Sequence, residues 1–283
     1  MDQKFISLFD RYTHGGMSRR AFLDRLTALA GSAAAVTALL SVLDNNYASA
    51  AVVPEADSRL QLAEVEIVPG IAGYLALPKE HTGKLPSVLI VHENRGLNPH
   101  IKDIARRVAL EGFLAFGADY LAPKGGTPAD KDKARDMIGQ LLAADVLAYS
   151  LAAAKALRGH QGTNGKVGAL GFCWGGGQVN ALAVADPELS AGVAYYGMQP
   201  KGEDVTKIKA PLLLHYAGLD ERTNAGIKDF EAALKADNKT YEIHLYEGAN
   251  HAFNNDTNTA RYDKAAADLA WGRTIGFLRK NLA

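Results

Sequence analysis

One cysteine lies in the part of the sequence that could most readily do chemistry. Cys173 stands in the run GFCWGGG (171–177), directly after the apolar residues 167–170 and directly before a helical pattern. This order is typical of a nucleophile elbow, a sharp strand-to-helix turn that holds the nucleophile in a strained conformation at the start of a helix. Flanking glycines avoid collisions in such a turn, and the helix N-terminus favours a thiolate. The alternative is a glycine-rich turn whose cysteine only fills space.

A nucleophile in an elbow needs a base and an acid that orients it, in the chain order nucleophile, acid, histidine. Asp220 follows the expected strand 211–217, and His251 follows the expected strand 241–246. Sites in open α/β folds lie at such carboxyl ends of strands. We therefore predict that Cys173 is the nucleophile, His251 the base and Asp220 its partner. Glu221 is the fallback acid, and Asp220 taken alone would be interpreted as a helix N-cap.

The loop after the expected strand 88–91 reads HENRG (92–96). In elbow hydrolases this loop donates one amide of the oxyanion hole, and the residue after the nucleophile donates the other. We therefore expect the backbone N–H groups of Asn94 and Trp174 to form the hole. Glu93 is unusual there because a carboxylate opposes a nearby thiolate. His92 and Glu93 lack the second histidine of the HExxH zinc motif.

Strand and helix patterns alternate from residue 61 onward, which predicts a doubly wound, mostly parallel sheet. Two closely spaced strands at its start predict an antiparallel hairpin at one edge. The expected strands are 63–68, 73–77, 87–92, 114–118, 166–171, 191–196, 211–217 and 241–246. The expected helices are 98–111, 129–158, 174–185, 221–236 and 259–281.

These motifs together resemble the dienelactone hydrolase family (carboxymethylenebutenolidase-like proteins) of the α/β-hydrolase superfamily. The resemblance rests on Glu93, the Gly-x-Cys-x-Gly-Gly elbow, the later Asp220 and the His-x-Phe run that ends at Phe253, and it covers nearly all of residues 60–283. It implies an α/β-hydrolase fold and the triad of Cys173, His251 and Asp220. It also implies that Glu93 hydrogen-bonds the resting thiol until substrate displaces the carboxylate.

The sequence departs from this family at the expected substrate clamp. Dienelactone hydrolases follow the third core strand with an arginine that binds the substrate carboxylate, whereas this chain reads DYLAP (119–123) with Pro123 in that place. Proline cannot form a bidentate clamp. We expect Tyr120, Lys124 and Phe253 to contact the substrate, with Lys124 as a partial substitute for the arginine.

Residues 1–50 resemble a twin-arginine export signal. The run SRRAFL (18–23) is followed by a weakly apolar, alanine-rich segment to about residue 43 and then by Ala48-Ser49-Ala50. Cleavage after Ala50 would leave residues 51–283 as one domain in the periplasm or outside the cell. The alternatives are an amphipathic N-terminal helix and a membrane anchor, for which the segment is short and weakly apolar.

Composition excludes several other classes of protein. The 283 residues include 31 Lys and Arg against 31 Asp and Glu, so no excess positive charge favours nucleic acid. A hydrophobic fraction of 48% excludes a disordered chain or a protein with many membrane spans, and we expect no stable membrane span in the mature chain. The lone cysteine excludes an intramolecular disulfide and any CxxC motif.

We therefore expect a hydrolase of small carboxylic esters or lactones that forms an acyl-enzyme on Cys173 and uses no metal or cofactor. Its expected partners are the small-molecule substrate and, for the precursor, the twin-arginine export machinery. A thiol acyltransferase or peptidase on the same fold remains an alternative. A non-catalytic ligand-binding protein is another.

Overall fold

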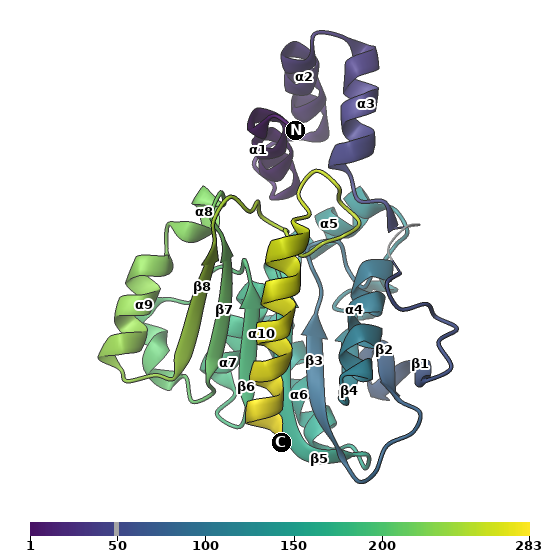
Figure 1. The fold of residues 1–283 in the computed structure, drawn as a ribbon, viewed down its shortest axis with the longest axis vertical. Coiled ribbons are helices and arrows are strands. Elements are labelled where there is room, and N and C mark those ends of the chain that lie inside the picture. The colour runs from purple at the N-terminus through teal and green to yellow at the C-terminus, as the bar shows by residue number, and fades with distance from the viewer. Residues whose placement is uncertain (48–50) are drawn as a thin grey trace.

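A mixed sheet of eight strands organises the part of the chain that the structure describes, residues 1–47 and 51–283 (Figure 1). The structure is a computed structural model. Strands lie in the order β1-β2-β4-β3-β5-β6-β7-β8, and the six strands β3 to β8 run parallel. β1 and β2 form an antiparallel hairpin, and β2 pairs antiparallel with β4. The predicted doubly wound sheet with an antiparallel edge hairpin is confirmed.

The strands agree with the sequence prediction to within three residues at each end. They are β1 (Leu60–Val68), β2 (Ile71–Pro78), β3 (Leu85–Val91), β4 (Leu114–Ala118), β5 (Thr163–Phe172), β6 (Ala191–Tyr195), β7 (Leu212–Ala217) and β8 (Tyr241–Tyr246). The central strands are buried on both faces, which explains their nearly continuous apolar runs.

Helices cover both faces of this sheet. α4 (Pro99–Leu110) and α10 (Lys264–Leu282) pack on one face, and α6 (Ala143–Gly159), α7 (Trp174–Ala185) and α9 (Ile227–Ala236) pack on the other (Figure 1). Two predicted helices are each divided: 129–158 into α5 (Lys131–Gly139) and α6, and 221–236 into α8 (Glu221–Asn224) and α9. The breaks fall beside Gly139 and at Gly226, because glycine weakens a helix.

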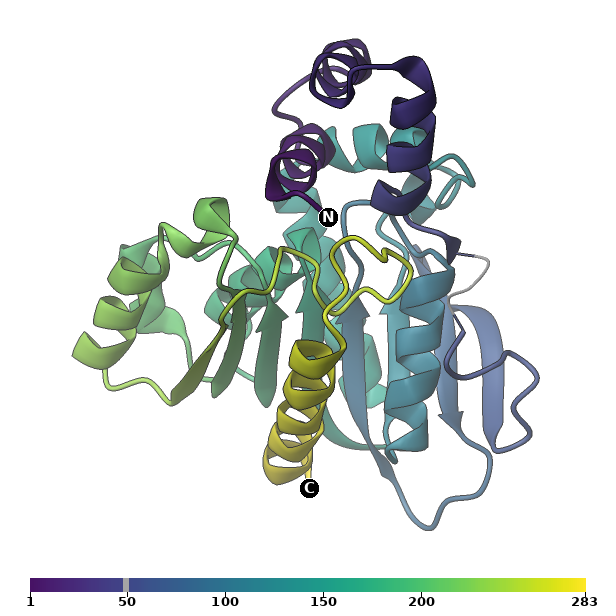
Figure 2. The same cartoon turned by 45° about the horizontal axis from the view of Figure 1, so that its top comes forward.

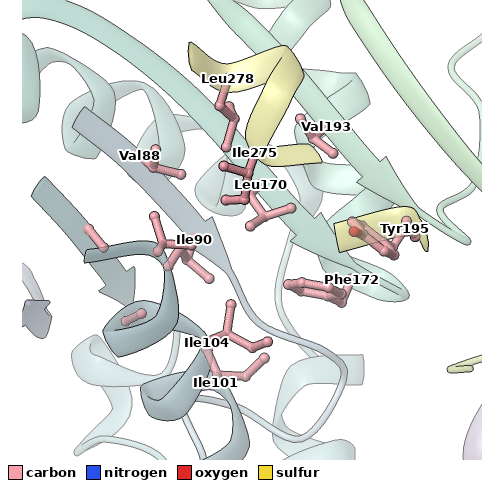
Figure 3. Packing of buried hydrophobic residues seen from close by; sticks show 14 of the residues in the cluster. Val88, Ile90, Ile101, Ile104, Leu170, Phe172, Val193, Tyr195, Ile275 and Leu278 are labelled. Atoms are coloured by element: carbon pink, nitrogen blue, oxygen red, sulfur yellow. The ribbon is translucent and has the colours of Figure 1, made fainter. Parts of the chain in front are cut away.

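A hydrophobic core fills each side of the sheet. Figure 3 shows the core under α4 and α10, where aliphatic side chains of β3, β5 and β6 meet those of the two helices. Its labelled members include Val88, Ile90, Ile101, Leu170, Val193 and Leu278. Leu89 and Val91 alternate with Val88 and Ile90 and enter the opposite core. This two-sided burial makes the sheet a rigid frame for the loops at its carboxyl edge.

Residues 1–47 form a separate helical cluster above that edge. It consists of α1 (Gln3–Thr13), α2 (Arg19–Ala30) and α3 (Ala33–Leu43), drawn in purple in Figures 1 and 2. Its small core includes Phe9, Leu26 and the stacked rings of Tyr12 and Phe22, 4.5 Å apart. We call residues 1–47 the N-terminal cap.

No single helix in the described residues is long and apolar enough to cross a membrane. The bent pairs α2 with α3 and α5 with α6 meet the length and composition criteria only when each pair is taken together. The Ala48-Ser49-Ala50 segment, at which we predict cleavage, lies outside the described residues.

Candidate active site

The lone cysteine occupies a strained turn between β5 and α7. Cys173 has a φ of 56°, in the left-handed region, and directly precedes the first residue of α7. A Cβ on Gly171 would lie 2.2 Å from the Gly175 carbonyl oxygen, and one on Gly175 would lie 2.3 Å from that of Val91. A side chain at Gly171 or Gly175 would therefore collide with the backbone. The turn has the geometry of a nucleophile elbow.

Asp220 and His251 meet at the ends of neighbouring strands β7 and β8. Asp220 Oδ2 lies 2.5 Å from His251 Nδ1, and both side chains are buried. Asp220 also caps α8, because its Oδ1 accepts a hydrogen bond from the Thr223 backbone N–H at 3.1 Å. The second bond fixes the carboxylate that orients the imidazole. His251 Nε2 has no hydrogen-bond partner among the described residues.

The charges around the thiol favour its ionised form. Burial opposes ionisation of Cys173, but His251 and His14 outweigh this and lower the pKa of the thiol to about 6. Burial likewise opposes protonation of His251, while Cys173 and Asp220 raise its pKa to about 10. Between these values the pair is a thiolate and an imidazolium ion, the form of an activated cysteine nucleophile.

A second histidine reaches the same thiol from the N-terminal cap. His14, the C-cap of α1, places Nε2 3.3 Å from Cys173 Sγ. Its Nδ1 lies 2.8 Å from the Asp10 carbonyl oxygen and 3.3 Å from Asp10 Oδ1. The His14 and His251 rings meet edge to face, with centroids 4.7 Å apart. His14 lies within the predicted export segment, and nothing in the sequence indicated its position at the thiol.

The cap is held over the site by polar contacts with several loops. Asn94 Nδ2 donates to the Thr13 carbonyl at 2.7 Å, and Arg95 Nη1 lies 2.8 Å from Asp44 Oδ1. Phe9 is flanked by the guanidinium groups of Arg95 and Arg261, at 5.9 and 5.2 Å from its ring centre. These contacts explain why His14 can lie at the thiol.

The expected oxyanion residues lie close to the elbow thiol. Asn94 and Trp174 both line the cavity that contains Cys173. Trp174 begins α7, and its ring stacks on His92 with centroids 5.3 Å apart. Their backbone N–H groups remain the predicted donors for an oxyanion.

Glu93 does not hydrogen-bond the thiol in this structure, contrary to the expected resting state. Its Oε2 accepts from Asn255 Nδ2 at 2.8 Å, and its Oε1 is buried without a hydrogen-bond partner in the described chain. The physical reason is that His14 occupies the hydrogen-bonding position at Cys173. Asn255, which the sequence did not indicate, holds the Glu93 carboxylate away from this bond.

Tyr120, Lys124 and Phe253, the three residues predicted to contact substrate, do not line the cavity that contains Cys173. The Tyr120 hydroxyl is buried 2.7 Å from Ser150 Oγ, and its ring supports Trp174 edge on. Phe253 belongs to the core behind His251. Lys124 is exposed on a short 3-10 helix (Ala122–Lys124). The side chains of Tyr120 and Phe253 turn into the core, although both residues follow strands.

A cavity of about 540 Å³ opens beside the thiol, between the cap, α5 and the start of α7. Tyr196 lines it with a φ of 39° at the end of β6, a strand-end position that could have been recognised from the sequence. Its charged lining residues are Arg135, Asp136 and Arg222, of which Arg135 and Asp136 form an ion pair. The remaining lining residues include Thr13, Ile138, Gln178 and Met198.

The sheet order, the elbow and the strand-end residues define an α/β-hydrolase. The sequence model described as the Dienelactone hydrolase family matches residues 71–282. The chain therefore belongs to the dienelactone hydrolase family. A second model, described as YqhI-like, matches residues 1–31, which include α1 and α2.

Relatives agree with this assignment. The chain is 35% identical over 217 residues to a Salmonella typhi protein named "Putative carboxymethylenebutenolidase", covering 71% of this chain and 80% of the relative. A protein of the same name from Saccharolobus solfataricus is 31% identical over 253 residues, covering 74% and 94%. A crystal structure named "Putative Dienelactone Hydrolase" from Klebsiella pneumoniae superposes with a TM-score of 0.70 at 30% identity, covering 78% of this chain and 99% of that one.

Proposed function

We propose that the protein hydrolyses small carboxylic esters or lactones through a triad of Cys173, His251 and Asp220. One observation carries the proposal: Asp220 holds Nδ1 of the buried His251, Nε2 has no hydrogen-bond partner in the described residues, and a ring nitrogen of His251 lies within 4.8 Å of the elbow thiol. An unpartnered, oriented imidazole beside a low-pKa thiol is the arrangement that nucleophilic catalysis requires. Membership of the dienelactone hydrolase family supports the reaction class.

In the first half-reaction, the Cys173 thiolate attacks the ester carbonyl carbon and forms a C–S bond. Electrons move onto the carbonyl oxygen, which the backbone N–H groups of Trp174 and Asn94 stabilise. When the intermediate collapses, the C–O bond breaks and protonated His251 donates its Nε2 proton to the leaving oxygen. The products are an alcohol, or the ring-opened end of a lactone, and an acyl group on Cys173.

In the second half-reaction, neutral His251 takes a proton from water, and the resulting hydroxide attacks the thioester carbonyl. The C–S bond breaks, a carboxylic acid leaves, and Cys173 returns as the thiolate beside protonated His251. Asp220 holds His251 Nδ1 throughout, so Nε2 alone faces the reacting atoms. The negative charge of Asp220 also stabilises the imidazolium ion in each half-reaction.

The size and lining of the cavity favour a small substrate that bears an anionic group. Its volume of about 540 Å³ suits a small molecule. Arg135 forms ion pairs with Asp132 and Asp136. Arg222 instead contacts Met198 Sδ and has no carboxylate within ion-pair distance among the described residues. Arg222 is therefore our candidate for an anionic substituent, in place of the arginine missing at Pro123.

The test compares the purified full-length chain with Cys173→Ala on a panel of aryl esters and enol lactones. We expect hydrolysis by the wild-type chain, loss of about 1,000-fold or more in kcat in the variant, and a trapped acyl group on Cys173 by mass spectrometry. Equal turnover by the two proteins would contradict the assignment. Transfer of the acyl group to added alcohol or amine in preference to water would instead identify an acyltransferase.

We propose separately that the precursor is exported by the twin-arginine pathway and that residues 1–50 are then removed. Support comes from the SRRAFL run and the alanine-rich segment that follows it. Arg19 pairs with Asp132 when the cap is docked, while Arg20 is exposed. N-terminal sequencing of protein recovered from the periplasm should begin at Ala51. Recovery only of intact chain from the cytoplasm would exclude export.

A further inference from the structure

Three potential metal ligands converge where the N-terminal cap meets the elbow. His14, Cys173 and His251 offer ligand atoms that all lie within 4.8 Å of one another. The His14 Nε2 to Cys173 Sγ separation is already 3.3 Å. His14 is mostly buried, and Cys173 and His251 are buried.

Both imidazoles are oriented so that the same nitrogen faces the thiol. His251 Nδ1 is fixed by Asp220, and His14 Nδ1 is fixed by the carbonyl and carboxylate of Asp10. Each Nε2 is thereby directed toward Cys173, and His251 Nε2 is buried without a partner in the described residues. Histidines that bind metals show this arrangement, in which the second ring nitrogen is held by a carboxylate or a backbone carbonyl.

From this geometry we propose that His14 Nε2, Cys173 Sγ and His251 Nε2 form a binding site for a zinc ion. The hydrolytic reaction proposed above needs no metal, so this site is a property of the chain beyond that reaction. It requires the N-terminal cap, since His14 supplies one of the three ligands, so the site belongs to the chain that retains residues 1–47.

The ligand set favours zinc over hard cations. One thiolate and two imidazoles suit Zn²⁺, whereas Mg²⁺ and Ca²⁺ prefer oxygen ligands. Tetrahedral zinc with Zn–S of about 2.3 Å and Zn–N of about 2.0–2.1 Å places neighbouring ligand atoms roughly 3.3–3.6 Å apart. The upper end of this range, about 3.5–3.6 Å, applies to a nitrogen–sulfur pair, so His14 Nε2 and Cys173 Sγ would move apart by about 0.2–0.3 Å. Movements of about 1 Å would bring the His251 ring nitrogen, within 4.8 Å of the other ligand atoms, into the range. The fourth position would face the cavity that His14 and Cys173 both line, where water completes the coordination.

Zinc at this site inhibits the proposed hydrolase. The ion takes the thiolate lone pair that would attack the carbonyl and the Nε2 lone pair that would activate water. No redox step is involved: Cys173 binds as the thiolate, protonated His251 releases its Nε2 proton to solvent as zinc takes that lone pair, and a chelator restores the free groups. Zinc also joins the cap to the rest of the chain, because one ligand directly follows α1 and the other two lie at strand ends.

The experiment uses metal-free, full-length protein and titrates it with Co²⁺ and Zn²⁺. Bound cobalt should give a thiolate-to-cobalt charge-transfer band in the near ultraviolet, together with visible bands of tetrahedral coordination. Zinc should displace cobalt with 1:1 stoichiometry. Competition with a chromophoric chelator then gives the zinc affinity without any activity measurement.

Two variants separate this site from binding by Cys173 and His251 alone. His14→Gln retains much of the side-chain volume, and we expect it to weaken zinc binding by about 100-fold or more because one of three ligands is lost. His81→Gln is the matched control, because His81 is exposed and hydrogen-bonds the Gly83 carbonyl far from the site. The control should bind zinc as the wild type does.

Circular dichroism and the thermal midpoint establish that each variant is folded, and Asp10→Asn serves as a second test if His14→Gln is not. That variant should bind zinc about 10-fold or more weakly because His14 loses part of its orienting shell. Zinc affinity unchanged in either folded variant would overturn the proposal, as would a cobalt complex without the charge-transfer band. Hydrolysis by the metal-free protein is measured separately, so failure of the zinc site is distinct from failure of the hydrolase.

Discussion

Asp220 and His251 form a buried pair in which the carboxylate Oδ2 lies 2.5 Å from the imidazole Nδ1. Asp220→Asn retains the shape of the side chain but removes its negative charge, and an amide NH₂ facing Nδ1 favours the wrong tautomer of His251. We expect kcat/KM for an aryl ester to fall by about 10,000-fold. Glu221→Gln is the control, because Glu221 is exposed and neighbours Asp220 in sequence. A larger loss in the control would assign the acid role to Glu221.

The thiol and imidazole titrations predict how activity depends on pH. The active pair needs a thiolate, which forms above the Cys173 pKa of about 6, and an imidazolium, which persists below the His251 pKa of about 10. The kcat/KM profile should therefore rise through about pH 6 and fall through about pH 10. Iodoacetamide alkylation of Cys173 should show the acidic limb directly. Alkylation that begins only near pH 8.5, as for an ordinary cysteine, would contradict the proposed ion pair.

We predict that the elbow can fold without strain only if residue 171 has no side chain. Gly171→Ala places a Cβ 2.2 Å from the Gly175 carbonyl oxygen, so the turn must shift. We expect a loss of about 3 kcal/mol or more in the free energy of unfolding. Gly276→Ala in α10 is the control, where no atom lies within 4 Å of the added Cβ, and it should stabilise the protein by about 0.5–1 kcal/mol. Urea denaturation measures both changes.

The sequence was sufficient to predict the sheet and the strand-end residues. Buried parallel strands carry apolar runs that can be recognised without tertiary information, and their carboxyl ends place Cys173, Asp220 and His251 at one edge. Tyr120 and Phe253 also follow strands, but their side chains lie in the core. Position after a strand locates a residue at the edge but does not determine whether its side chain turns toward the cavity or into the core.

The N-terminal cap places His14 at the thiol, and the sequence could not predict this contact. His14 lies 159 positions before Cys173, and its contact depends on how a helical unit docks on several loops. The cap docks through single contacts, such as those of the Phe9 ring with the guanidinium groups of Arg95 and Arg261. Such contacts do not form a repeating sequence pattern that could be recognised in advance. The same segment has the composition of an export signal, so its sequence favoured that interpretation.

Docking of the cap should control access to the thiol. Asp44→Asn removes the carboxylate that accepts from Arg95 and Lys131, at 2.8 and 2.5 Å. Arg95 is buried whereas the Asp44 side chain is 40% exposed, so we expect docking to weaken by about 1–2 kcal/mol. Alkylation of Cys173 by a bulky maleimide should become about 10-fold faster, since 1.4 kcal/mol is a factor of ten in population.

Asp204→Asn, which breaks an ion pair with Lys207 away from the cap, should leave the rate unchanged. Equal rates in both variants would show that the cap does not limit access.

Arg222 should determine whether the site prefers a charged substrate. Its guanidinium lines the cavity beside the thiol and contacts Met198 Sδ at 3.4 Å, with no carboxylate within ion-pair distance among the described residues. A carboxylate on the substrate could pair with it bidentately, whereas a neutral ester could not. Arg222→Gln should therefore raise KM about 10-fold for an ester that carries a carboxylate and leave KM for its methylated analogue within about 2-fold, with kcat little changed for both. Arg20→Gln, at an exposed position on α2, is the matched control. An equal rise in KM for the two esters would show that Arg222 shapes the cavity without recognising charge, and the anionic substrate class would have to be abandoned.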